Sequence, residues 1–219
     1  MRFTSMGRNE IFKYTFFILL LILIMILAGS WFIWMLPLPL VLLGFLFYFF
    51  RDPERVSPND NNALISPADG TVTHIEKITD CDTLHCEAWR VSIFLSIFDV
   101  HLNRSPFSGT VKEVIYQKGE FFDARNPDSL TRNENNTIIF VGQNPKLPLF
   151  AIRQIAGLIA RKIVCAVKPG DTVNAGTRIG MMKFSSRTDF IIPANSNIVW
   201  NIKIGDKVEA GSTIIGRLV

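Results

Sequence analysis

The chain is poor in the residues that crosslink small secreted proteins or hold structural metals. Its 219 residues include only three cysteines and three histidines. Three cysteines cannot all form pairs, which favours a reducing compartment over a disulfide-bonded secreted fold. Cys81, His85 and Cys86 lie close together, but a structural zinc needs a second close pair of ligands, and Cys165 comes without one. The sequence therefore predicts no metal site.

Charge is also scarce, both in total and locally. The formal net charge is +4 and no run of lysine or arginine occurs, so we expect no nucleic-acid partner. Residues 14–50 carry no charge at all. As one helix this stretch would measure about 55 Å, against a bilayer core of about 30 Å. Pro37 and Pro39 interrupt it, so residues 1–50 are interpreted as a membrane anchor, a hairpin of helices near 14–34 and 38–50.

The basic residues that flank the apolar stretch predict its orientation. Arg2, Arg8 and Lys13 precede it, and Arg51 and Arg55 follow it. By the positive-inside rule both ends lie on the cytoplasmic side of the cell (inner) membrane. A cleaved signal peptide is disfavoured, because the apolar run resumes after its small residues.

The remaining part, residues 51–219, has the composition of a mostly β (α+β) domain. Short runs rich in β-branched and aromatic residues alternate with Gly, Pro and Asn, and they include TVTHIEKI, RVSIFLSIF, GTVKEVIYQ, NTIIFVG, LFAIRQIAGLIA, KIVCAV and NIVWNIKI. Only residues 155–163 and the polar piece 123–132 leave room for a short helix or turn.

An internal repeat closes the chain. GDTVNAG at 170–176 recurs as GDKVEAG at 205–211, and each copy is followed by an isoleucine and a glycine. Each copy combines a Gly-Asp turn, an inward valine and a second tight turn. We expect two pseudo-twofold hairpins in a β-sandwich or barrel-like domain, with a hammerhead (lipoyl-like) arrangement of the C-terminal repeats.

Three polar positions are candidates for chemistry. Asp69 lies in the turn SPADG, His101 follows the apolar run of FLSIFDVHLNRSP, and Ser186 follows Ser185 in GMMKFSSRTDF. A serine hydroxyl is a poor nucleophile unless a neighbouring base takes its proton, and an acid commonly orients that base. Asp69, His101 and Ser186 supply these types, but their spacing alone leaves purely structural roles open.

Several motifs, in one order along the chain, resemble the short bacterial and archaeal type of phosphatidylserine decarboxylase proenzyme. The resemblance runs from the anchor to the C-terminus, and it rests on FFRDPER (49–55), SPADG (66–70), VSIFLSIFDVHLNRSP (91–106), NE (133–134), QIAGLIARKIV (154–164) and IGMMKFSSRTD (179–189).

The resemblance implies an enzyme that makes its own cofactor. The proenzyme would cut itself between Ser185 and Ser186 into a β chain of residues 1–185 and an α chain of 186–219. Ser186 would become a pyruvoyl group, which forms a Schiff base with membrane phosphatidylserine and assists its decarboxylation to phosphatidylethanolamine and CO₂. The implied partners are this lipid, the two chains of one proenzyme, and further copies in a homo-oligomer.

The resemblance also assigns roles, with two departures. Asp69 would orient a histidine that acts as base for self-cleavage, and His101 would serve both cleavage and decarboxylation. Longer relatives carry a second histidine where this chain has Arg104, and family members usually have glycine where it has Ser185. Glycine permits the strained turn at such a bond more readily than serine does.

By charge alone, three arginines could hold the substrate phosphate: Arg104, Arg161 and Arg187.

Two other classes remain as alternatives. A biotinyl or lipoyl carrier would be modified on Lys183, between the two repeats, but such a domain needs only about 80 residues and leaves residues 51–163 unexplained. A membrane-anchored lipoyl-like adaptor would need long helical hairpins with heptads, and this sequence shows no such period.

Overall fold

The computed structural model describes residues 2–123, 126, 129–158, 162–183 and 186–219. The chain divides into two compact units, Met1–Pro53 and Glu54–Val219. Ser185 and Arg161, two of the predicted site residues, lie outside the described residues.

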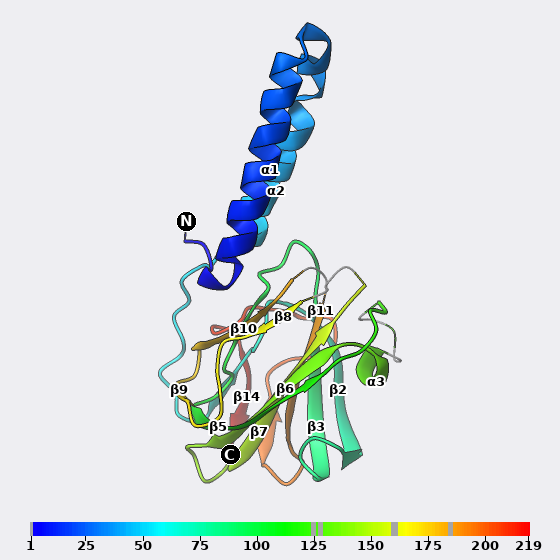
Figure 1. The fold of residues 1–219 in the computed structure, drawn as a ribbon. Helices are drawn as coiled ribbons and strands as arrows, with labels where there is room; N and C mark the ends of the chain where they lie inside the picture. The colour runs from blue at the N-terminus through cyan, green and yellow to red at the C-terminus, as the bar shows by residue number, and fades with distance from the viewer. Residues whose placement is uncertain (1, 124–125, 127–128, 159–161, 184–185) are drawn as a thin grey trace. The chain divides into compact units, whose positions relative to one another are not determined.

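The first unit is a pair of apolar helices (Figure 1). Its elements are η1 (Ser5–Gly7), α1 (Arg8–Leu27), η2 (Ser30–Met35) and α2 (Pro37–Phe49). Two segments, Ser5–Leu27 and Trp31–Phe49, are long and apolar enough to cross a membrane by length and composition.

The helix bounds differ from the sequence expectation at the first helix. It begins at Arg8 and ends at Leu27, whereas 14–34 was expected. Gly29 has a backbone φ of 105°, a conformation that favours glycine and ends the helix. Pro37 then occupies the first position of α2, where its missing N–H costs no hydrogen bond.

The second unit is mostly β, as its composition predicts. Its strands are β1 (Ala63–Ile65), β2 (Gly70–Cys81), β3 (Cys86–Leu95), β4 (Leu102–Arg104), β5 (Gly109–Gln117), β6 (Asn135–Gly142), β7 (Leu149–Ala156), β8 (Ile163–Cys165), β9 (Thr172–Val173), β10 (Arg178–Met182), β11 (Ser186–Pro193), β12 (Ile198–Trp200), β13 (Lys207–Val208) and β14 (Ile214–Leu218). One short helix, α3 (Ser129–Arg132), lies in the polar piece where a helix was allowed. The other piece with room for a short helix or turn, residues 155–163, begins as a strand instead, because Ile155 and Ala156 belong to β7.

These strands form one large curved sheet and two small ones (Figure 1). The eight-stranded sheet has the order β13-β2-β3-β11-β7-β6-β5-β9, and the small sheets are β1-β14-β12 and β4-β10-β8. The two repeat copies supply β9 and β13, which are the two edge strands of the large sheet. The pairs Gly109↔Val173 and Gly70↔Val208 attach them.

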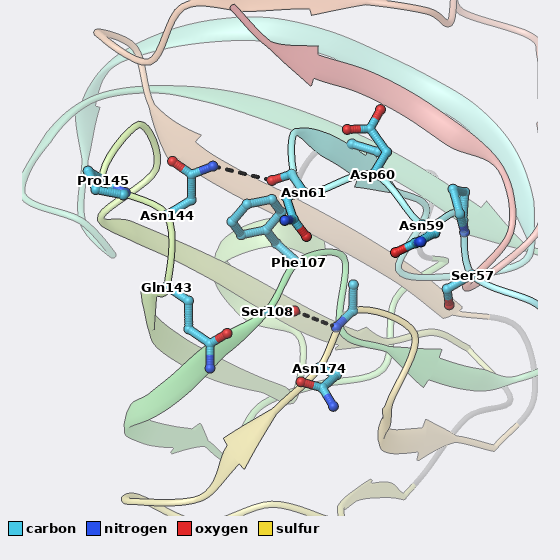
Figure 2. A pocket seen from close by; sticks show the side chains of 13 residues that line it. Ser57, Asn59, Asp60, Asn61, Phe107, Ser108, Gln143, Asn144, Pro145 and Asn174 are labelled. Carbon is cyan, nitrogen blue, oxygen red and sulfur yellow. Dashed lines mark hydrogen bonds between the residues drawn. The ribbon is translucent and has the colours of Figure 1, made fainter.

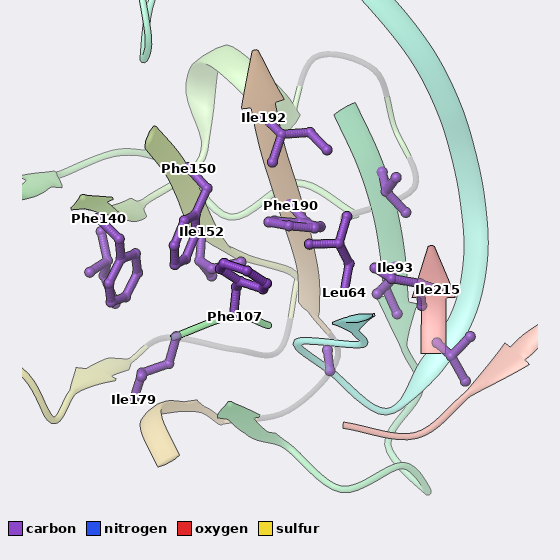
Figure 3. Packing of buried hydrophobic residues seen from close by; sticks show 14 of the residues in the cluster. Leu64, Ile93, Phe107, Phe140, Phe150, Ile152, Ile179, Phe190, Ile192 and Ile215 are labelled. Carbon is purple, nitrogen blue, oxygen red and sulfur yellow. The ribbon is translucent and has the colours of Figure 1, made fainter. Parts of the chain in front are cut away.

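The core of this unit is rich in phenylalanine (Figure 3). Phe140 and Phe150 stack with ring centroids 4.7 Å apart, and Phe107 and Phe190 each meet the Phe150 ring edge-on at 6.2 Å. All four side chains are nearly or fully buried. Burying such a side chain stabilises a fold by roughly 1.5–3 kcal/mol, so this cluster fixes the strands that carry the polar residues described next.

Candidate active site

Most of the predicted site residues lie at one end of the large sheet, which we call the site end. There β3 ends at Leu95, β7 ends at Ala156 and β11 begins at Ser186. Ser186 pairs with both Leu95 and Ala156. Because these strands are antiparallel, the connections that follow β3 and β7 leave the sheet beside the start of β11.

Ser186 is the first residue of a central strand rather than of a sheet edge. Its side chain is fully buried, and its Oγ has no hydrogen-bond partner among the described residues. A buried hydroxyl without a partner costs free energy, and such groups concentrate at sites with a chemical role.

His101 lies just before β4, close to the chain that leads to Ser186. The backbone N–H of Met182 donates to the carbonyl of His101 at 3.0 Å, and only four residue steps separate Met182 from Ser186. The ring Nδ1 of His101 lies 3.0 Å from the carbonyl oxygen of Asp99. A carbonyl can only accept, so Nδ1 carries a proton and donates it in this hydrogen bond.

Buried side-chain amides connect β4, the strand that follows His101, with β11, the strand that begins at Ser186. Asn103 Nδ2 donates to Thr188 Oγ1 at 2.8 Å, and Gln154 Nε2 donates to Asn103 Oδ1 at 2.8 Å. Asn103 lies two residues after His101, and Thr188 lies two residues after Ser186. Ser186 and Thr188 point to the same face of β11, because residues two apart on a strand do so. The hydrogen bond to Thr188 therefore places β4, the strand that follows His101, beside the face that carries Ser186.

Asp69 lies in the turn that enters β2, also at the site end. Its Oδ1 accepts from the backbone N–H of Ala210 at 2.7 Å, and its Oδ2 accepts from Arg55 at 2.9 Å. Burial raises the pKa of the Asp69 carboxyl above its ordinary value, the Ala210 hydrogen bond and Arg55 act to lower it, and the charge of nearby Asp99 adds to the rise. His101 is not among its hydrogen-bond partners in the described part of the chain, so its role in orienting that ring stays a prediction.

The comparisons with known proteins agree on one family. A family model described as phosphatidylserine decarboxylase matches residues 42–216. A phosphatidylserine decarboxylase proenzyme of Desulfotalea psychrophila is 44% identical over 176 residues, which cover 80% of each chain. One of Chlorobium chlorochromatii is 42% identical over 217 residues, which cover 98% of this chain and 99% of the relative.

The chain belongs to the phosphatidylserine decarboxylase family. It is therefore a decarboxylase, as the motifs of the site end predict. The family match covers residues 51–163, which a biotinyl or lipoyl carrier leaves unexplained. Lys183 is buried here, with its backbone N–H donating to the carbonyl of Lys162 at 3.3 Å, whereas a carrier presents its modified lysine to solvent.

Two of the three arginines proposed to hold phosphate are engaged inside this decarboxylase. Arg104 is buried, and its guanidinium donates to the carbonyl of Gly176 at 3.0 Å. Arg187 is buried as well, and it donates to Asp189 at 2.7 Å and to Ser92 Oγ at 2.6 Å. Their internal partners explain both positions structurally, and phosphate binding by them stays a prediction.

A polar cavity of the second unit does not coincide with the site end. It has a volume of about 530 Å³ and is lined by polar loops that include Asn61, Ser108, Asn144 and Asn174 (Figure 2). Ser108 precedes the start of β5, which pairs with the end of β6. The cavity therefore lies at the opposite end of the sheet, which we call the pocket end. The candidate nucleophile and base lie at the site end and not in this cavity.

Sequence reasoning missed the residues that support the site. Asn103, Thr188 and Arg55 all lie inside motifs that carried the resemblance, but nothing in their spacing showed which strands would meet. Cys81 and Cys86 lie opposite each other in the β2–β3 hairpin, and both are free thiols. Within the residues that the structure describes, no group of three His, Cys, Asp or Glu side chains could hold a metal ion.

Proposed function

We propose that this chain is a self-cleaving, pyruvoyl-dependent decarboxylase that converts phosphatidylserine to phosphatidylethanolamine and CO₂ at a membrane. The observation that carries the proposal is Ser186, a buried serine without a hydrogen-bond partner in the described chain, at the start of a central strand. Family membership supplies the reaction, and relatives are named proenzymes.

The proposed cleavage uses only the chain and water. Ser186 Oγ attacks the carbonyl carbon of Ser185, and the peptide bond becomes an ester as the nitrogen is released from the acyl group. A base then removes the Cα proton of Ser186, and the Ser185 carboxylate leaves as the new C-terminus of residues 1–185. Water converts the remaining dehydroalanine to a ketone and ammonia. The result is a pyruvoyl group on the chain 186–219.

The residues present fit such a group. The Ser186 side chain is buried and its Oγ has no hydrogen-bond partner among the described residues, so a ketone there breaks no hydrogen bond that the structure shows. When formed, the pyruvoyl group supplies an electron sink for loss of the substrate carboxylate. Pairing of Ser186 with Leu95 and Ala156 holds the new N-terminus in the sheet after the chain is cut.

His101 is proposed as the proton-transfer group for both stages. Its Nδ1 donates to the Asp99 carbonyl, and Nε2 is the ring nitrogen that would accept or return a proton. Asp69 is proposed as the carboxylate that orients it. The support for Asp69 is its position at the site end, in the turn that enters β2 beside the end of β3.

The membrane side of the proposal rests on the apolar segments of the first unit. Basic residues on both flanks support a cytoplasmic decarboxylase on the inner membrane, where its lipid substrate resides. The hammerhead-like interpretation of the C-terminal repeats belongs to the same proposal and is supported by their matching turns at the two sheet edges. A homo-oligomer stays a prediction.

The decisive experiment is intact-mass analysis of the purified full chain and of Ser186→Ala. The unmodified protein should yield a fragment of residues 186–219 with a ketone in place of its N-terminal amine, together with CO₂ release from phosphatidylserine. Ser186→Ala should remain one chain and release no CO₂. Ser196→Ala, which alters another buried serine whose Oγ has no hydrogen-bond partner among the described residues, is the control and should still be cut. Cleavage of Ser186→Ala at this bond would refute the proposal.

A further inference from the structure

Two connections leave the large sheet beside Ser186, and each exposes a large apolar side chain. Phe98 lies three residues after Leu95, the end of β3, and Leu158 lies two residues after Ala156, the end of β7. Phe98 is 61% exposed and Leu158 is 63% exposed. Since Leu95 and Ala156 are the two strand partners of Ser186, both side chains follow strand ends that lie beside Ser186.

Exposed lysines accompany these apolar side chains. Lys162 lies directly before β8, and Lys207 lies on β13, where it pairs with Thr71 at the site end. The Lys207 ammonium lies 3.9 Å from the carboxylate of Asp99, the neighbour of Phe98. Apolar side chains beside lysines are the combination that enters the boundary between headgroups and acyl chains of anionic membranes.

A lipid surface fits this combination better than a protein partner does. The second unit begins at Glu54, only five residues after the apolar helix α2 ends at Phe49, so the chain itself keeps this unit beside any membrane that the helices enter. On the proposed function, the acyl chains of the substrate stay in that membrane while its headgroup reacts at Ser186. The site end of the sheet must then face the membrane surface.

We propose that Phe98 and Leu158 form a membrane-contacting rim that enters the surface of an anionic bilayer and lets the headgroup of a bilayer lipid reach Ser186. The inference rests on the proposed function. It adds a contact that is separate from the apolar helices, and it assigns the two side chains to lipid access rather than to bond making.

The test compares one enzyme on two forms of substrate. The full chain is placed in phosphatidylcholine nanodiscs, and CO₂ release is measured from long-chain phosphatidylserine in the disc and from a short-chain phosphatidylserine dissolved as monomers. The variant is Phe98→Ser with Leu158→Ser. The control is Val141→Ser, which removes a 47% exposed side chain near the pocket end.

The double variant should lose about tenfold or more of kcat/KM on the bilayer substrate, because two apolar contacts with lipid are lost. It should keep its self-cleavage and its rate on the dissolved substrate within about twofold, and Val141→Ser should match the parent on both. An equal loss on both substrates, or no loss on either, would overturn the rim. If the parent protein neither cleaves nor releases CO₂ from either substrate, the proposed function fails and the rim fails with it.

Discussion

The turn that carries Asp69 has a counterpart elsewhere in the same chain. SPADGTV at 66–72 and SPFSGTV at 105–111 share five of their seven positions. In both, the serine hydroxyl donates to the carbonyl two residues on, at 2.7 Å in one and 2.6 Å in the other. In both, the serine carbonyl accepts from the glycine that ends a repeat copy, Gly211 at 2.9 Å and Gly176 at 2.8 Å.

The two turns differ at two positions, and the exchange that changes the chemistry is Asp69 for Ser108. Asp69 Oδ1 accepts from the N–H of Ala210 at 2.7 Å, and in the counterpart Ser108 Oγ accepts from the N–H of Ala175 at 3.0 Å. The backbone is held in the same way, but only the first turn brings a carboxylate, paired with Arg55, to the end of the sheet where Ser186 lies. The repeat therefore builds the scaffold, and the exchange of Asp69 for Ser108 distinguishes the site end from the pocket end.

The largest expected effect comes from making the two turns alike. Asp69→Ser places the counterpart's residue at the site end, where the hydroxyl can still accept from Ala210 but carries no charge. If Asp69 supports proton transfer, self-cleavage should slow by about 10²-fold to 10⁴-fold, the range for a lost acid–base group. The measurement is the fraction of uncut chain over time after synthesis in a cell-free system.

Ser108→Ala is the matched control, because it removes the same backbone contact in the other turn without touching the site end. It should cut at the parent rate and lose about 1 kcal/mol of stability. Cleavage of Asp69→Ser at the parent rate, with Arg55 still paired to Glu209, would show that Asp69 is only a turn residue like Ser108.

A smaller effect is expected at the glycines of the second repeat copy. Gly211 has a φ of +79°, and a Cβ there would lie 2.7 Å from Cδ of the buried Arg104. Gly205 has a φ of +96° but open space around it. Gly211→Ala should therefore cost about 2–3 kcal/mol, from backbone strain and crowding, and Gly205→Ala about 1 kcal/mol.

Urea unfolding of both glycine variants in a Ser186→Ala background measures this difference on an uncut chain. An equal loss of unfolding free energy in Gly211→Ala and Gly205→Ala would mean that the Arg104 side chain moves aside freely. The packing between the two turns would then be looser than the structure shows. Gly176→Ala tests the counterpart, where the neighbour is the Ser57 side chain instead.

The sequence predicted the large-scale organisation better than the surroundings of single residues. GDTVNAG and GDKVEAG indicate a repeat, because their turns need Gly and Asp at fixed places. In the structure the two copies contain β9 and β13, the edge strands of the large sheet. SPADGTV and SPFSGTV, which contact the two repeat copies, form a second repeated pair that the sequence also contains. Arg187 could not be placed, because a charge next to a reactive serine gives no sign that strand pairing will bury it against Asp189.

The smallest expected effect is a pH dependence of stability that belongs to Asp69 and not to Ser108. Burial raises the pKa of folded Asp69 above 3.8, so the folded chain binds more protons than the unfolded chain between 3.8 and the raised value. The stabilisation by protonated Asp69 is complete below pH 3.8 and is lost as the pH rises through the folded pKa. In the Ser186→Ala background, the free energy of unfolding relative to an added Asp69→Asn should therefore fall as the pH rises across that window, and Ser108→Ala should show no such trend. A relative stability that rises with pH would mean that Arg55 and the Ala210 N–H outweigh burial, and Asp69 would then be a permanently charged anchor rather than a group that can exchange protons.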